Sequence, residues 1–168
     1  EWDRQWMLIN EKNRFVSQRQ LPIMALLKAR VNADQLYLSF PNSEDLILPI
    51  SKDSEATTES VTMHRADEKI PVEIIPAATE WLKQTLLSQS RYQSLRLVKL
   101  AKGFERRIPD YPDQASYQTQ LSDGFPYLVT STTSLAIIND RLLELDPYRQ
   151  PIGMNRFRPN IVLDLKEP

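Results

Sequence analysis

Arginine and asparagine side chains stand at the ends of predicted strands, and these residue types bind anionic, planar groups. The segment RFRPN contributes Arg156, Arg158 and Asn160 directly before the apolar run Ile161 to Leu165. Arginine donates paired hydrogen bonds to phosphate or carboxylate, and an asparagine amide both donates and accepts. Pro159 predicts an extended backbone at Arg158, because a proline ring disfavours the helical region for the preceding residue. The segment suits an anionic ligand, and a sheet edge with surface charges is the open alternative.

Two further arginines stand beside apolar runs near the start of the chain. Arg4 follows Asp3 and precedes the run from Trp6 to Ile9, so its guanidinium is expected at a strand entrance, where a phosphate or a pterin edge could bind. Arg19 lies in QRQLP, where Pro22 fixes a turn. Each has a structural alternative, since Arg4 could form a rim salt bridge and Arg19 could brace the turn.

A tight turn is predicted at the segment SDGFP, which contains Ser122, Gly124 and Phe125. Gly124 would permit a close backbone approach to a ligand, and Ser122 could donate to a phosphate. The single histidine, His64, ends a predicted strand and is interpreted as structural or exposed. The sequence matches no Ser/His/Asp signature, glycine-rich phosphate loop or metal-ligand spacing.

The composition excludes several kinds of site. Hydrophobic residues make up 41% of the 168 positions and charged residues 26%, which predicts a folded globular protein. The 21 Lys and Arg residues balance 22 Asp and Glu residues, so we expect no nucleic-acid partner. Without cysteine and with one histidine, the chain offers no thiolate ligand and no multi-histidine metal site. No apolar run reaches the roughly 18 residues of a membrane span, so we expect a cytoplasmic location.

The elements that would position these residues are mostly short strands. Apolar runs and period-two alternation predict strands at residues 6–9, 15–16, 23–31, 36–40, 46–50, 61–64, 71–75, 95–100, 127–130 and 161–165, with an exposed loop at 51–60. One helical face is predicted to hold Ala78, Trp81, Leu82 and Leu86, in a helix of about three turns after Pro76. A second predicted helix is capped by Ser131 or Thr132 and ended by Pro147. The sequence therefore predicts an α+β fold, mostly β, with a barrel-like mixed sheet and a few packed helices.

Residues 102–126 lack any sustained period and hold three of the twelve prolines and two of the three glycines. Such a stretch is longer than most plain connections, so it predicts a long ordered loop and a domain junction. We expect two domains, residues 1–110 and residues 111–168. Both ends of the sequence fall at or near predicted strands, which suggests a piece of a longer protein.

Three separated blocks of the sequence, in this order, resemble the MOSC family: DRQWMLINEKNRFVSQRQLPIMALL, LSDGFPYLVTSTTSLAIIND and NRFRPNIVLDL. The resemblance spans nearly the whole chain. It implies a MOSC N-terminal beta barrel domain over residues 1–110 and the beginning of a MOSC domain over residues 111–168. It also implies kinship with amidoxime-reducing molybdenum enzymes, with bacterial proteins that detoxify N-hydroxylated bases, and with molybdenum cofactor sulfurase.

The family's cofactor is a molybdopterin held by basic and amide side chains, and the resemblance implies that matching positions here bind it. These positions are Arg4, Arg158 and Asn160, the turn residues Ser122, Gly124 and Phe125, and the further candidates Arg19 and Arg156. The resemblance also implies a Pro-x-Lys-Ser segment before residue 1 and a molybdenum-ligating cysteine after residue 168. The isolated chain is therefore expected to be inactive alone.

For the intact protein, the resemblance implies an oxidoreductase that reduces N-hydroxylated substrates. Molybdenum would pass two electrons to an N–O bond, and a flavin or iron–sulfur partner, such as a fused ferredoxin-type domain, would resupply them. Two alternatives stay open. One is a noncatalytic MOSC-like binding or scaffold module, and the other is a sulfur-carrier domain related to the sulfurases, some of which use pyridoxal phosphate.

Overall fold

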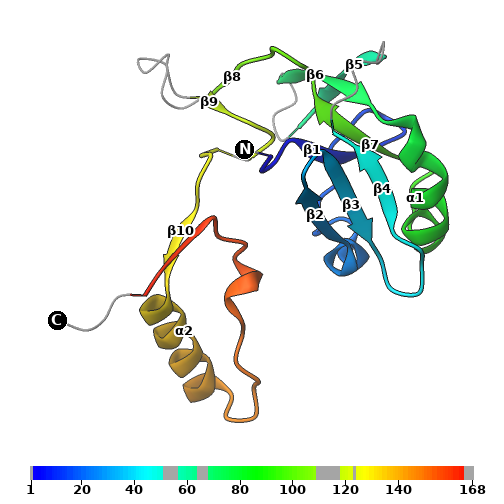
Figure 1. The fold of residues 1–168 in the computed structure, drawn as a ribbon. Coiled ribbons are helices and arrows are strands. Elements are labelled where there is room, and N and C mark those ends of the chain that lie inside the picture. The colour runs from blue at the N-terminus through cyan, green and yellow to red at the C-terminus, as the bar shows by residue number, and fades with distance from the viewer. Residues whose placement is uncertain (1, 51–56, 64–67, 109–117, 123, 165–168) are drawn as a thin grey trace. The chain divides into compact units, whose positions relative to one another are not determined.

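The computed structural model describes residues 2–50, 57–63, 68–108, 118–122 and 124–164, which form two compact units (Figure 1). Unit 1 is Glu1–Asp123 and unit 2 is Gly124–Pro168. The described strands lie in four sheets, accompanied by two α-helices. The predicted mixed α+β class is confirmed, although the described strands form separate sheets and no single closed barrel. The predicted domain boundary at residue 110 and the predicted role of His64 fall outside the described residues.

The largest sheet of unit 1 is antiparallel, and its first strand, β1 (Trp6–Asn10), pairs with β7 (Leu95–Leu100). They pair along their whole length, and β6 (Lys69–Ile74) and β5 (Thr58–Thr62) continue the sheet in that order. Successive side chains of a strand point to opposite faces. Leu8 therefore packs into one hydrophobic cluster, whereas Met7 and Ile9 pack into another.

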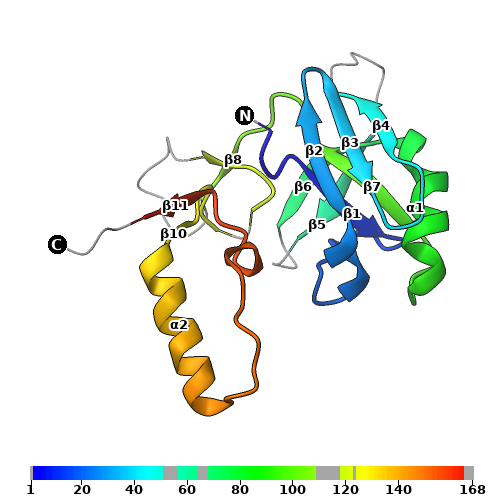
Figure 2. The same ribbon diagram turned by 60° about the horizontal axis from the view of Figure 1, so that its bottom comes forward.

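Figure 2 shows a second, three-stranded antiparallel sheet. Its side chains supply much of the first cluster. Its strands are β2 (Lys28–Asn32), β3 (Gln35–Ser39) and β4 (Leu46–Pro49). Leu36, Leu38 and Leu48 are buried in the same cluster as Leu8. The predicted hairpin between β2 and β3, with one buried face on β3, is confirmed.

The helix after Pro76 is shorter than predicted. It consists of α1 (Thr79–Thr85), with 3₁₀ turns η2 (Pro76–Ala78) before it and η3 (Leu87–Gln89) after it. Ala78, Leu82 and Leu86 recur every fourth residue and are fully buried in the first cluster, beside β7. The predicted apolar face is therefore confirmed, and the 3₁₀ turns replace the outer turns of the expected α-helix.

Two predicted boundaries are wrong. The strand expected from residue 23 begins at Lys28, because the segment before it forms a 3₁₀ turn, η1 (Pro22–Leu26), with proline at its first position. The loop expected over residues 51–60 gives way to β5 at Thr58, because the β5 backbone pairs with β6. Residues 51–56 of that loop lie outside the described residues.

Unit 2 is a strand–helix–strand arrangement (Figure 2). Its strands β10 (Val129–Ser131) and β11 (Ile161–Leu163) are parallel, and α2 (Thr132–Leu145) lies between them in the chain. Two neighbouring parallel strands need such a crossover, because the chain must return to the starting end of the sheet before the second strand begins, and a tight turn cannot span that distance. Asn139 of α2 holds the returning segment, accepting from the Ile152 N–H at 2.9 Å and donating to the Ile152 carbonyl at 3.1 Å.

The predicted cap of α2 is confirmed at Ser131, whose Oγ accepts from the Ser134 N–H at 3.0 Å. Among the described residues of unit 2, no hydrophobic side chain is buried. No helix in the described part of the chain is long and apolar enough to cross a membrane.

The first prediction concerns the core of unit 1. Leu48 is 4% exposed, whereas its neighbour Ile47 on the same strand is 50% exposed. Leu48→Ala should lower the free energy of unfolding by about 2 to 5 kcal/mol, because it leaves a cavity. Ile47→Ala should cost about 1 kcal/mol or less. Urea unfolding followed by tryptophan fluorescence measures this, since Trp2, Trp6 and Trp81 all lie in unit 1, and equal losses would contradict the assignment of the buried face.

The second prediction concerns the cap of α2. Ser131→Ala should destabilise the helix by about 1 kcal/mol, because the Ser134 N–H loses its acceptor. Faster hydrogen exchange of the first-turn amides would report this loss. Ser131→Asp is the matched control, since its carboxylate restores an acceptor at the same position, and exchange as fast as in Ser131→Ala would argue against capping.

Candidate functional site

The RFRPN segment forms a turn that leads into β11. A short 3₁₀ turn, η4 (Met154–Arg156), precedes it, and the Arg158 N–H donates to the Asn155 carbonyl at 3.3 Å. Arg158 then adopts a left-handed backbone with φ of +52°. The predicted extended conformation of Arg158 is therefore wrong, because the residue that ends a helical turn often reverses the chain through left-handed angles, and this requirement overrides the preference set by Pro159.

The polar side chains of this turn divide into two kinds. Arg156 and Arg158 are exposed. Asn160 has a structural role, since its side-chain oxygen accepts from the Leu128 N–H at 3.0 Å and its own N–H donates to the Leu128 carbonyl at 2.9 Å. These bonds join the segments that precede β10 and β11, so Asn160 orients the turn that carries the two arginines.

Gly124 and Phe125 belong to the first residues of unit 2. A Cβ added at Gly124 would meet no atom within 4 Å, so packing within the protein does not require glycine there. Space for a close approach exists at this position. The Phe125 ring is largely exposed.

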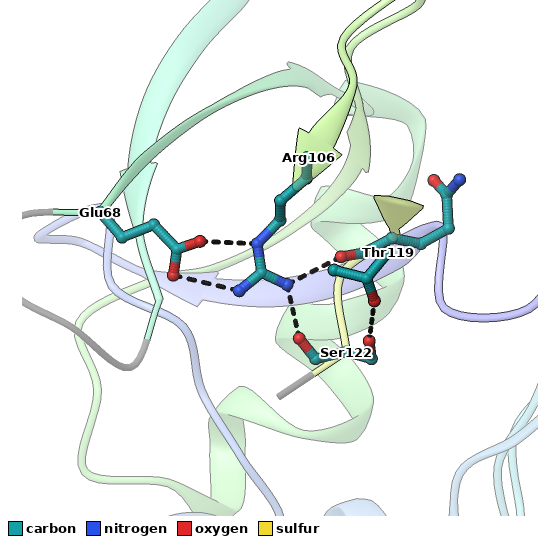
Figure 3. Close-up of polar contacts among 5 residues, drawn as sticks. Glu68, Arg106, Thr119 and Ser122 are labelled. Carbon is teal, nitrogen blue, oxygen red and sulfur yellow. Dashed lines mark hydrogen bonds and ion pairs between the residues drawn. The ribbon is translucent and has the colours of Figure 1, made fainter. Parts of the chain in front are cut away.

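Ser122, at the end of the described part of unit 1, lies in a buried polar cluster around Arg106 of β8 (Arg106–Arg107). Figure 3 shows the Arg106 guanidinium between the Glu68 carboxylate on one side and the turn of Thr119 and Ser122 on the other. Nε donates to Glu68 Oε1 at 2.6 Å and Nη2 to Oε2 at 3.1 Å. The Ser122 hydroxyl is buried and hydrogen-bonds to the Thr119 hydroxyl, so it faces a protein group in this structure.

The turn at residues 119–122 is tied directly to Arg4. Arg106 Nη1 donates to the Gln120 carbonyl at 2.9 Å and to the Ser122 carbonyl at 2.5 Å. Between them, the Leu121 N–H donates to the Arg4 carbonyl at 2.9 Å. Two predicted residues are therefore linked through one turn: Ser122 lies in the turn, and Arg4 accepts a hydrogen bond from it.

Arg4 lies two residues before the first residue of β1, near the strand entrance where it was predicted. Its guanidinium pairs with Asp3, and its backbone is left-handed, with φ of +54°. The flanking tryptophans anchor this segment, since the Lys99 ammonium lies 5.3 Å from the Trp2 ring centroid and 5.8 Å from that of Trp6. The rim salt bridge considered for Arg4 is thus present, and the Arg4 side chain as a whole is 22% exposed.

Arg19 lies on the exposed turn before η1. The turn is closed by other groups, because the Gln20 and Leu21 N–H groups both donate to the Ser17 carbonyl at 3.0 Å. Gln20 Oε1 also accepts from the Ser17 N–H at 2.9 Å. These bonds hold the turn without the Arg19 guanidinium.

Each unit, taken by itself, offers arginine side chains that fit an anionic ligand better than a metal ion. Arg4 and Arg19 in unit 1 and Arg156 and Arg158 in unit 2 supply guanidinium groups with some or full exposure, which suit a phosphate. Among the described residues, no group of three or more His, Cys, Asp and Glu side chains gathers. The side chains present therefore fit the phosphate and the polar edge of a pterin.

Sequence reasoning missed Arg106. It lies in the aperiodic segment, where a charged residue is usually solvated, and its partner Glu68 lies 38 positions earlier. No local spacing connects the two. The one local feature at this position is the pair of adjacent arginines, Arg106 and Arg107, within a segment that has no periodic pattern.

Comparisons with known proteins bear on this arrangement. Residues 1–89 match the family model of the MOSC N-terminal beta barrel domain. Over 168 aligned residues the chain is 30% identical to human mitochondrial amidoxime-reducing component 1, covering 96% of this chain and 45% of that protein. Bovine mitochondrial amidoxime reducing component 2 is 27% identical, with 96% and 46% covered. Molybdenum cofactor sulfurase of Drosophila melanogaster is 20% identical, with 98% of this chain and 19% of that protein covered.

The chain thus spans less than half the length of these curated relatives. The matched family model nevertheless covers more than half of its 168 residues, including β1 to β6 and α1. The chain therefore belongs to the MOSC proteins, as a member that carries the MOSC N-terminal beta barrel domain.

Proposed function

We propose that this chain is part of an oxidoreductase that binds the molybdenum cofactor and reduces N-hydroxylated substrates. The observation that carries the proposal is the exposed pair Arg156 and Arg158 on the turn into β11, which Asn160 orients. The names of the relatives, which include amidoxime-reducing components and a molybdenum cofactor sulfurase, support the same chemistry.

Arg156 and Arg158 of unit 2 would bind the phosphate of molybdopterin. Guanidinium groups donate two parallel hydrogen bonds to such an oxyanion, and the opposite charges strengthen both. In unit 1, Arg4 and Arg19 are separate candidates for an anionic group of the cofactor. The Asn160 side chain would keep the RFRPN turn in register with β10 while the arginines bind.

The cofactor, when bound, supplies the metal that exchanges two electrons with the substrate, and the protein side chains bind and orient the reactants. An amidoxime would take up two electrons and two protons, its N–O bond would break, and an amidine and water would form. A flavin or iron–sulfur protein is the proposed electron donor. Since cysteine thiolates hold such clusters and these 168 residues contain no cysteine, an iron–sulfur centre would be bound outside residues 1–168, in a fused domain or in a separate protein.

A second candidate function is a noncatalytic binding or scaffold module, or a sulfur-carrier domain. The scaffold applies if the natural protein has no molybdenum-ligating cysteine after residue 168, because a thiolate is the ligand that completes a molybdenum centre of this kind. The similarity to a molybdenum cofactor sulfurase favours the carrier. Both alternatives share cofactor binding with the main proposal and differ from it in catalysis.

The third prediction tests the proposed function with the natural protein that contains these residues. The purified protein should hold molybdenum and pterin, and it should convert benzamidoxime to benzamidine with reduced methyl viologen as the electron source. Metal analysis and chromatography of the product measure the two outcomes. Bound cofactor without benzamidine would favour the scaffold or carrier, and absence of both cofactor and product would contradict the whole proposal.

The fourth prediction concerns Arg158. In the same protein, Arg158→Ala should weaken cofactor binding about tenfold to hundredfold, because one charge-assisted contact worth about 1.5 to 3 kcal/mol is lost. Alanine and arginine both carry a Cβ, so the left-handed backbone at residue 158 costs about the same free energy in the variant, and the turn should change little. Molybdenum and pterin per chain, measured at limiting cofactor, give the effect.

The matched control is Arg141→Ala. Arg141 is an exposed arginine of the same unit that pairs with Glu144 on α2, so its loss removes the same charge far from the RFRPN turn in sequence. It should leave cofactor occupancy unchanged and alter stability by about 0 to 1 kcal/mol. Equal occupancy in Arg158→Ala and wild type would end the claim for Arg158.

A further inference from the structure

We propose that Arg106 is a positioning residue that holds Arg4 in place for an anionic group of the cofactor, an inference that rests on the proposed function. Arg106 itself is 4% exposed and is bonded to protein groups, so it acts through its neighbours.

The Arg106 guanidinium is engaged on both of its edges. Nε and Nη2 face the Glu68 carboxylate, and Nη1 donates to the carbonyls of Gln120 and Ser122 (Figure 3). The carboxylate fixes the plane of the guanidinium, because a fork of two parallel bonds permits little rotation. The two carbonyls must therefore point toward that plane, which fixes the backbone of the turn.

The turn transmits this constraint to Arg4. Leu121 lies between the two held carbonyls, its side chain packs into the cluster of Met7 and Ile9, and its N–H donates to the Arg4 carbonyl. The left-handed backbone of Arg4 is unfavourable for a residue with a side chain, and such a conformation persists where its surroundings fix it. The Leu121 hydrogen bond is one of the contacts that fix it.

Lysine could not replace arginine in this role. An ammonium group is a compact charge without the planar fork, so it cannot bridge a carboxylate and two carbonyls in a fixed plane. Stability alone does not explain the cluster, because well-packed apolar residues usually stabilise a core as well as a buried ion pair does. The geometry explains it, since each neutral acceptor of Arg106 belongs to the turn that holds Arg4.

The fifth prediction is a double-mutant cycle in the natural protein, with Arg106→Lys, Arg4→Ala and the double variant. Arg106→Lys alone should weaken binding of molybdopterin about tenfold, the loss expected for one displaced charge-assisted contact. In the Arg4→Ala background the same change should alter binding by no more than about twofold, because the side chain that Arg106 positions is already gone. The Leu121 amide should also exchange faster in Arg106→Lys than in wild type.

The matched control is Arg96→Lys. Arg96 is a partly buried arginine of the same unit that pairs with Glu59 at 2.9 Å and with Asn13, and none of these residues lies in the 119–122 turn. It should lower stability without changing cofactor affinity or Leu121 exchange. If Arg106→Lys does not fold, Glu68→Gln serves in the same cycle, because it keeps the size of the side chain and removes the charged fork.

Independent, additive losses in the cycle, or wild-type affinity in Arg106→Lys, would overturn the positioning role while leaving the proposed function intact. A wild-type protein that holds no cofactor would instead overturn the proposed function. In that case unchanged Leu121 exchange in Arg106→Lys would show separately that Arg106 does not hold the turn.

Discussion

The antiparallel pairing of β1 with β7 supports the rest of unit 1. Both strands bury side chains on both faces, so the two hydrophobic clusters meet across one backbone ladder. A break in this ladder would expose Leu8 and Leu97 on one face and Ile9 and Val98 on the other. The candidate residue Arg4 lies two residues before the first residue of β1, and its position therefore depends on the most deeply buried pair of strands in the described part of the chain.

Next to this apolar core, unit 1 buries the Arg106 guanidinium, which donates hydrogen bonds to the Glu68 carboxylate and to two backbone carbonyls. Removing one partner of a buried ion pair costs about 3 to 5 kcal/mol, because the remaining charge keeps its desolvation penalty. Arg106 avoids that penalty through Glu68 and two backbone carbonyls. The hydrogen bonds of Arg106 fix the backbone of the 119–122 turn. Strands β8 and β9 (Gln118–Thr119) are only two residues long, so their pairing alone would hold this turn weakly.

Unit 2 depends on a different set of forces. None of the hydrophobic side chains among its described residues is buried, and its order comes from backbone pairing, the Ser131 cap and the amides of Asn139 and Asn160. Each such hydrogen bond contributes only about 0.5 to 1.5 kcal/mol. A turn held by these local bonds can present exposed arginines with a defined backbone, which is the property that the proposed cofactor contact requires.

The sequence by itself determined the elements whose signals are local. Alternation predicted β3 and β7, helical spacing predicted the face of Ala78 and Leu82, and residue type predicted the Ser131 cap. Ordered blocks of residues identified the family. The tertiary structure decided the rest. The turn that ends η4 gives Arg158 a left-handed backbone and overrides the extended conformation that Pro159 favours for the residue before it. The hydrogen-bonded connection from Glu68 through Arg106 and Leu121 to Arg4 exists only once β6, β8 and β1 are folded. Side chains far apart along the chain leave no periodic signal, because their spacing is set by the path of the backbone between them.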